Sequence, residues 1–154
     1  MARLEWAVNG ALHAADEMPL ELGQLAAILA EDQGRVCFRA HPSIRLLRAD
    51  YPVDDIWRAV LNRDDEALTA LDLASGPVCL LVERNATGIE VSRLQEPLWR
   101  LLAVLCSGVA LSSAVEAVAD IDASSALGAH LAAGRFIAFT LSAHETRESR
   151  AATA

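Results

Sequence analysis

Residues 35–57 carry the sequence RVCFRAHPSIRLLRADYPVDDIW, and the expected fold follows from this stretch. Apolar and polar residues alternate over residues 35–40, which is typical of a strand with one buried face. Residues 44–49 form a second extended run. Pro42 has no N–H to donate to a sheet, so we place it in the turn between the runs or at a sheet edge.

A short helix is predicted directly after the second run. Pro52 suits the first helical turn, and Asp54 and Asp55 are favoured near the positive end of the helix dipole. We therefore interpret these paired acids as a helix start. The helix covers residues 53–61, and Trp57 lies on its apolar side, which indicates a core residue. By the same default we assign the other two tryptophans to the core, Trp6 and Trp99.

The rest of the chain predicts helices and strands in a mixed order. The expected helices cover residues 2–15, 95–106, 111–119 and 123–133, and the expected strands cover 77–84, 89–94 and 136–141. A hairpin, three helices and a strand make a winged-helix-like unit, whose second and third helices form a helix-turn-helix. We predict an α+β fold in three parts: a short N-terminal helix and β/helix segment over 2–76, a winged-helix-like domain over 77–141, and a disordered tail over 142–154.

The charge of the chain opposes binding to nucleic acid. Its 154 residues carry a formal net charge of −8, and all 13 basic residues are arginines. Such a surface repels phosphate unless one face is locally basic. Residues 109–134, which contain the predicted helix-turn-helix, hold three acids and no Lys or Arg. Because a DNA-reading helix needs such donors, we expect this element to be scaffold or to contact protein.

Other patterns exclude several kinds of function. The three cysteines stand far apart without metal-site spacing, and we expect free thiols in a reducing cytosol. No signal peptide is recognisable, and the longest uncharged run, residues 101–115, is shorter than the ~20 residues that span a bilayer. From these two observations we expect a cytoplasmic protein. Because no nucleotide, hydrolase or metal-ligand motif occurs, we also predict no cofactor, no metal and no catalytic residue.

Several short motifs together resemble one known family. They are ARLEWA at 2–7, ALHAAD at 11–16, HPS at 41–43, YPVDDIWRA at 51–59, SRL at 92–94 and LAAGRF at 131–136. In this combination they are similar to the HvfC/BufC family, which an older label describes as a DNA-binding domain. The resemblance covers about residues 2–141. Full members carry a helical region before the ARLEWA helix, so we expect this sequence to be a short variant or part of a longer protein.

The resemblance implies a partner protein and not an enzyme. Members of the family, MbnC- and TglI-like proteins among them, accompany multinuclear non-haem iron oxidases that modify cysteines of ribosomally made peptides. The iron and the chemistry belong to the oxidase, and copper-binding peptides are one product class. The family member docks on the oxidase and holds the leader of the precursor peptide by strand addition. We expect that role here, and a DNA-binding winged-helix transcription regulator is the alternative.

The candidate surface for a peptide or partner lies in the opening stretch. It comprises Arg35, Arg39, His41, Arg45, Arg48 and Trp57. If the two extended runs pair, the four arginines share one exposed surface, where guanidinium groups suit the carboxylates of an acidic leader. An ordinary solvated sheet face is the plainer interpretation. The edge at Pro42 leaves backbone groups open to an added strand. For His41 we favour a hydrogen bond that fixes the turn, and for His130 a hydrogen-bonded place in the core.

Overall fold

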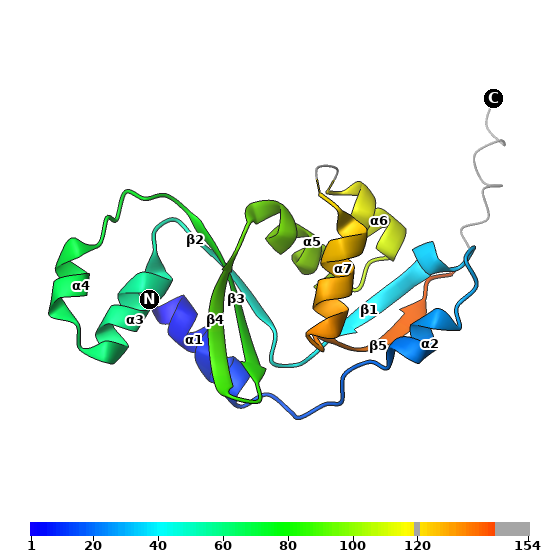
Figure 1. Cartoon of the computed structure of the whole chain (residues 1–154), viewed down its shortest axis with the longest axis horizontal. Helices are drawn as coiled ribbons and strands as arrows, with labels where there is room; N and C mark the ends of the chain where they lie inside the picture. The colour runs from blue at the N-terminus through cyan, green and yellow to red at the C-terminus, as the bar shows by residue number, and fades with distance from the viewer. Residues whose placement is uncertain (119–120, 144–154) are drawn as a thin grey trace.

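The computed structural model describes residues 1–118 and 121–143, and within them the strands form two small antiparallel sheets (Figure 1). The presence of both helices and strands confirms the predicted α+β class. The helices are α1 (Ala2–Leu12), α2 (Leu22–Ala26), the short 3₁₀ helix η1 (Gln33–Arg35), α3 (Val53–Asn62), α4 (Asp65–Ala70), α5 (Glu96–Cys106), α6 (Leu111–Glu116) and α7 (Ala123–Ala132). The strands are β1 (Val36–Ala40), β2 (Arg45–Ala49), β3 (Val78–Asn85), β4 (Gly88–Leu94) and β5 (Phe136–Leu141).

The two extended runs of residues 35–49 belong to different sheets. β1 pairs with β5, whereas β2 is the first strand of a sheet with the order β2-β3-β4. The two runs therefore do not pair with each other, and their pairing was the condition for one shared surface of the four arginines. The reason lies in their apolar sides, because Val36 and Phe38 pack in one core and Leu47 packs in another. The turn at residues 41–44 carries the chain from one sheet to the other, and Pro42 lies in this turn.

β3 is the strand that joins the two cores. Successive side chains of a strand point to opposite faces, so Leu81 packs in the first core while Leu80 and Val82 pack in the second. The rings of Phe38 and Phe136 stack in the first core with their centroids 4.7 Å apart. Helix α5 supplies this core with Leu101, Leu102 and Leu105. Helix α1 supplies the second core with Leu4, Ala7 and Ala11.

The C-terminal part has the predicted order of hairpin, three helices and strand. Its last strand, however, pairs with β1 and not with the β3–β4 hairpin. Each sheet combines strands from both sides of residue 76, and the domain boundary there stays a prediction. Asp122 caps α7 as predicted, because its side chain accepts a hydrogen bond from Ser125 N at 3.0 Å. Gly108 and Gly134 follow α5 and α7 with φ of 80° and 69°, in the left-handed region that favours glycine.

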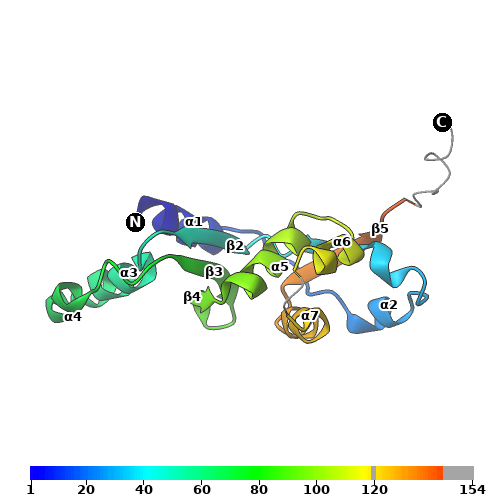
Figure 2. The same ribbon diagram turned by 90° about the horizontal axis from the view of Figure 1, so that it is seen from above.

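The molecule is elongated, with α3 and α4 at one end and the β1–β5 sheet with α2 at the other (Figure 1, Figure 2). Part of the predicted tail is ordered against the first sheet. Ser142 N donates to the Arg35 carbonyl at 2.9 Å, which continues the β1–β5 pairing by one residue. Residues 144–154 of the predicted tail lie outside the described residues. Among the described residues, every helix is too short or too polar to cross a bilayer.

Candidate functional site

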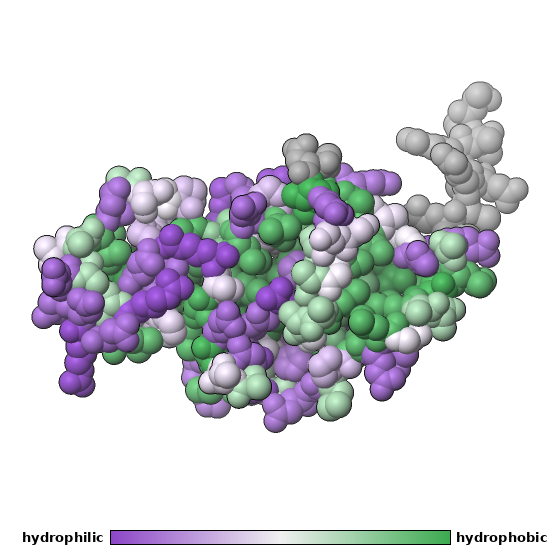
Figure 3. Space-filling view, in the orientation of Figure 1, coloured by the Kyte–Doolittle hydropathy of each residue, from purple (hydrophilic) through white to green (hydrophobic). Residues whose placement is uncertain are grey.

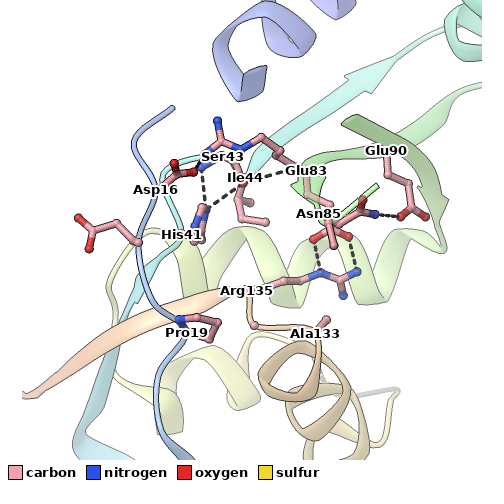
Figure 4. Close-up of a pocket in the computed structure, with 14 residues that line it drawn as sticks. Asp16, Pro19, His41, Ser43, Ile44, Glu83, Asn85, Glu90, Ala133 and Arg135 are labelled. Atoms are coloured by element: carbon pink, nitrogen blue, oxygen red, sulfur yellow. Dashed lines mark hydrogen bonds and ion pairs between the residues drawn. The ribbon is translucent and has the colours of Figure 1, made fainter. Parts of the chain in front are cut away.

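A polar cavity of about 540 Å³ lies where the chain crosses between the two sheets (Figure 4). Four segments meet there: the connection after α1, the turn at residues 41–44, the β3–β4 hairpin and the turn between α7 and β5. The polar and charged residues of its lining are Asp16, Glu17, His41, Ser43, Glu83, Arg84, Asn85, Glu90 and Arg135. The cavity therefore brings the HPS motif together with residues that are distant in sequence.

His41 and Ser43 fix the turn that crosses between the sheets. Ser43 N donates to His41 Nδ1 at 3.1 Å, and the Ser43 hydroxyl lies 2.9 Å from the same nitrogen. The Ser43 oxygen also accepts from Arg84 N at 3.3 Å, and His41 N donates to the Arg135 carbonyl at 2.8 Å. The prediction of a structural hydrogen bond at His41 is confirmed, and Ser43, which shares this network, is buried at 1% exposure.

Arg84, which lines the cavity, binds the end of α1. Its guanidinium donates to the carbonyls of Leu12 at 2.8 Å and Ala14 at 2.9 Å, and it pairs with Asp16 at 2.6 Å. The last carbonyls of a helix have no partner within the helix, and a cation is favoured at this negative end of the dipole. This role was not predicted, because only the tertiary structure brings Arg84 to α1.

Glu83, Arg135 and His130 form a second ionic group beside the cavity. Arg135 binds the Glu83 carboxylate in a bidentate manner, with N–O distances of 2.9 and 2.7 Å. Its third nitrogen lies 2.8 Å from His130 Nδ1. Because a guanidinium can only donate, Nδ1 is the acceptor and the ring proton sits on Nε2. Burial, together with the charge of Arg135, lowers the pKa of His130 to about 4.

The buried position predicted for His130 is confirmed, because the residue is only 4% exposed. Its hydrogen bonding is only half complete. Within the described residues, the buried Nε2 has no hydrogen-bond partner. A protonated ring would add a buried charge next to Arg135, so the fold favours the neutral imidazole.

Asp54 is the centre of an ionic cluster that holds α3 against β4. The residue is fully buried, and its carboxylate accepts two hydrogen bonds from Arg93, both at 2.8 Å, and one from Arg58 at 3.1 Å. Asp55 pairs with the same two arginines at the surface. Burial by itself raises the pKa of Asp54, but the hydrogen bonds and charge of Arg93 outweigh it, and the pKa lies below its usual value.

This cluster was missed by the interpretation of the two acids as a helix start alone. Asp54 and Asp55 do lie in the first turn of α3, so the local interpretation is confirmed. The spacing of Asp54 and Arg58, four residues apart on a helix, indicates an ion pair and could have shown part of the cluster. The larger part comes from Arg93, 39 residues later in the sequence.

The four predicted arginines do not form one surface. Arg35 pairs with Asp32 and donates to the Ser142 carbonyl. Arg45 donates to the carbonyls of Pro42, Ile44 and Gly10, on the side of the sheet that α1 covers. Arg39 is exposed on β1, and the side chain of Arg48 is 53% exposed and lies 3.3 Å from Glu96 at the start of α5. Arg35 and Arg45 are thus engaged within the chain, while Arg39 and Arg48 face solvent on different sheets.

The three tryptophans occupy different environments. Trp57 is partly buried against the second core, in agreement with its predicted place. Trp99 is partly buried, and its Nε1 donates to the Leu80 carbonyl at 3.1 Å. Trp6 is 78% exposed, so its assignment to the core is wrong. The buried side of α1 is formed by its small and aliphatic residues, and Trp6 falls on a different side of the helix.

The outer edge of β2 has no strand partner in the described residues. Arg58 donates to the Val91 carbonyl at 2.9 Å from outside the sheet, so the backbone groups of Val91 point away from β3. Backbone groups alternate in direction along an antiparallel strand. Given the register of the sheet, those of Leu46 and Arg48 also point away from β3. Neither backbone makes another hydrogen bond within the described residues, which leaves this edge open.

The described residues contain no group of three or more His, Cys, Asp or Glu that could hold a metal ion. The cysteines are free thiols, as predicted, and burial raises the pKa of Cys106 to about 11. Helices α6 and α7 follow each other in the predicted order, and residues 109–134 carry acids such as Glu116 and Asp122 but no Lys or Arg. Comparisons with protein-family models, with curated proteins and with solved structures find no match for this chain.

Proposed function

We propose that this chain is a non-catalytic subunit that recognises the leader of a ribosomally made precursor peptide and docks an iron-dependent oxidase that modifies cysteines of that peptide. The motif resemblance to the HvfC/BufC family motivates the proposal. The open edge of β2 is the observation that carries it, because an extended peptide can add to an unpaired strand through backbone hydrogen bonds.

Arg48 lies beside this edge and supports an acidic peptide as the added strand. Its pairing with Glu96 is between half-exposed side chains, and such surface pairs contribute only about 0–1 kcal/mol. A carboxylate of the incoming peptide can therefore take the place of Glu96. Arg45 stabilises the same strand from within, since its guanidinium is bound to three carbonyls. Of the predicted site residues, Arg48 is the one that combines exposure with a position on the open strand.

The acidic segment that contains α6 and α7 argues against the alternative of a DNA-binding regulator. Binding to a phosphate backbone requires basic groups that release counterions, and this element offers carboxylates. A contact with protein agrees better with this surface.

The proposal predicts that Arg48→Glu weakens the binding of a synthetic leader peptide about tenfold, the equivalent of one lost charge-assisted contact. Isothermal titration calorimetry measures this affinity. Arg100→Glu is the matched control, because Arg100 makes the same kind of exposed pair with Glu96 but lies on α5. The peptide should also slow hydrogen exchange at the amides of Leu46 and Arg48. Equal loss in both variants, or unchanged exchange at these amides, would overturn strand addition at β2.

A further inference from the structure

The apolar side of α3 continues beyond the core on which the helix packs. Val53 at its start is 3% exposed, and Trp57, one turn later, is partly buried against the second core. Val60 and Leu61 follow after one more turn and are 51% and 61% exposed. Residues three and four apart lie on one helix face, so these side chains form a single stripe. The stripe leaves the core as α3 advances toward the end of the molecule (Figure 1).

The segment that follows the exposed end of this stripe is rich in acidic residues. Helix α4 packs against α3, and residues 63–73 contain four acids and one arginine. All four acids are exposed: Asp64, Asp65, Glu66 and Asp72. Leu73 follows Asp72 directly in the chain and is 62% exposed. Figure 3 shows this end of the molecule, on the left, as hydrophilic residues with hydrophobic ones between them.

We propose that this region docks a basic amphipathic helix of a partner protein. The α3–α4 surface consists of Val60, Leu61 and Leu73 with Asp64, Asp65, Glu66 and Asp72. Apolar side chains of the incoming helix cover the end of the α3 stripe, as in other recognition of helices by apolar surfaces. Its Lys or Arg side chains face the surrounding carboxylates, which fixes orientation and accelerates encounter.

The charge of the surface selects this occupant over others. A second copy of the chain would bring the same acids into contact with each other, and like charges across an interface are costly. Nucleic acid and an anionic lipid surface carry phosphates, which these carboxylates repel. A basic helix satisfies both the apolar stripe and the acids around it. The inference goes beyond the proposed function, since it concerns α3 and α4 and not the β2 edge.

The test uses the full chain and a synthetic helical peptide of about four turns, with Leu on one face and Lys on the other. The change Val60→Ser with Leu61→Ser should raise the Kd for this peptide about tenfold, because the apolar contact is lost. The matched control is Leu22→Ser with Leu29→Ser at the opposite end of the molecule, where the two side chains are 54% and 64% exposed. Fluorescence anisotropy of the labelled peptide measures both Kd values.

A second pair of variants separates local charge from net charge. Asp65→Asn with Glu66→Gln removes two charges from the α3–α4 surface, and Glu21→Gln with Glu31→Gln removes two exposed charges elsewhere. The first pair should weaken binding several-fold more than the second, and amide shifts on peptide addition should cluster at residues 56–73. Equal effects of the matched variants, or shifts centred on another region, overturn the proposal. Thermal unfolding of each variant establishes that the fold is retained.

Discussion

The polar cavity between the two sheets and the α3–α4 surface use their charged residues in different ways. At the cavity, Arg84 binds the carbonyls at the end of α1, and Arg135 binds Glu83 and His130. These groups hold together segments that are distant in sequence. At the α3–α4 surface, the acids face solvent next to exposed apolar side chains such as Leu61. In one region the charged groups join distant segments, whereas in the other they are exposed to solvent, and among the described residues Asp64 and Asp72 accept only local backbone hydrogen bonds.

A concentration of charge in the sequence therefore does not locate an interface. The arginines of residues 35–48 are the most basic part of the chain, yet Arg35 and Arg45 bind backbone carbonyls. Arginine suits this work because its rigid fork offers several donors to carbonyls and carboxylates. Arginines that bind carbonyls within the chain contribute less positive charge to the exposed surface. The exposed surface is then more acidic than the sequence suggests, as it is at the acids of α4.

The largest expected effect lies at the packed start of α3, where Asp54 binds two arginines, and not at the exposed end of that helix. Asp54→Asn should lower the free energy of unfolding by about 3 kcal/mol, because it leaves Arg93 and Arg58 without their buried partner. Chemical denaturation measures the change. Asp55→Asn is the control, since this residue pairs with the same arginines but its side chain is 38% exposed, and its effect should stay below about 1 kcal/mol. Equal losses would show that burial of Asp54 does not matter.

A smaller effect is expected from His130 as the pH falls. Its pKa is about 4 in the folded protein and 6.5 in the unfolded reference, so the unfolded chain binds more protons between these values. Stability supported by the neutral ring is present above pH 6.5 and is lost as the pH falls toward 4. From pH 7 to pH 5 the loss should be about 2 kcal/mol.

His130→Asn isolates this contribution. The Asn side chain can still accept a hydrogen bond from Arg135 but does not titrate. Denaturation curves at pH 7 and pH 5 should show a stability difference that is about 2 kcal/mol larger in the parent chain than in the variant. If the two proteins lose the same stability over this range, the buried neutral histidine does not control how the free energy of unfolding falls with pH.

Local structure could be predicted from the sequence, because it depends on residues a few positions apart. The helix expected at residues 53–61 is observed as Val53–Asn62, and the last strand coincides with β5, Phe136–Leu141. The turn at His41 was also predictable, since a histidine, a proline and a serine in succession offer the needed hydrogen-bonding groups and backbone restriction.

The partners of these elements could not be predicted in the same way. Nothing in the alternation of residues 35–40 shows that β1 pairs with a strand about 100 residues later. The burial of Asp54 depends on Arg93, which reaches it only once α3 packs against the second sheet. Trp6 was wrongly assigned to the core for a related reason. Its size and apolar character indicate the core, but its helix buries a different side. Pairing over long distances in sequence is set by how the two cores form together.

We propose that this chain is a partner subunit for an oxidase and its peptide. Co-expression with a multinuclear non-haem iron oxidase from the same gene neighbourhood, followed by size-exclusion chromatography, is the direct test of this proposal. The two proteins are expected to elute as one complex. Elution of the chain alone, together with binding of duplex DNA that weakens steeply with salt, would overturn the proposal and support the regulator instead.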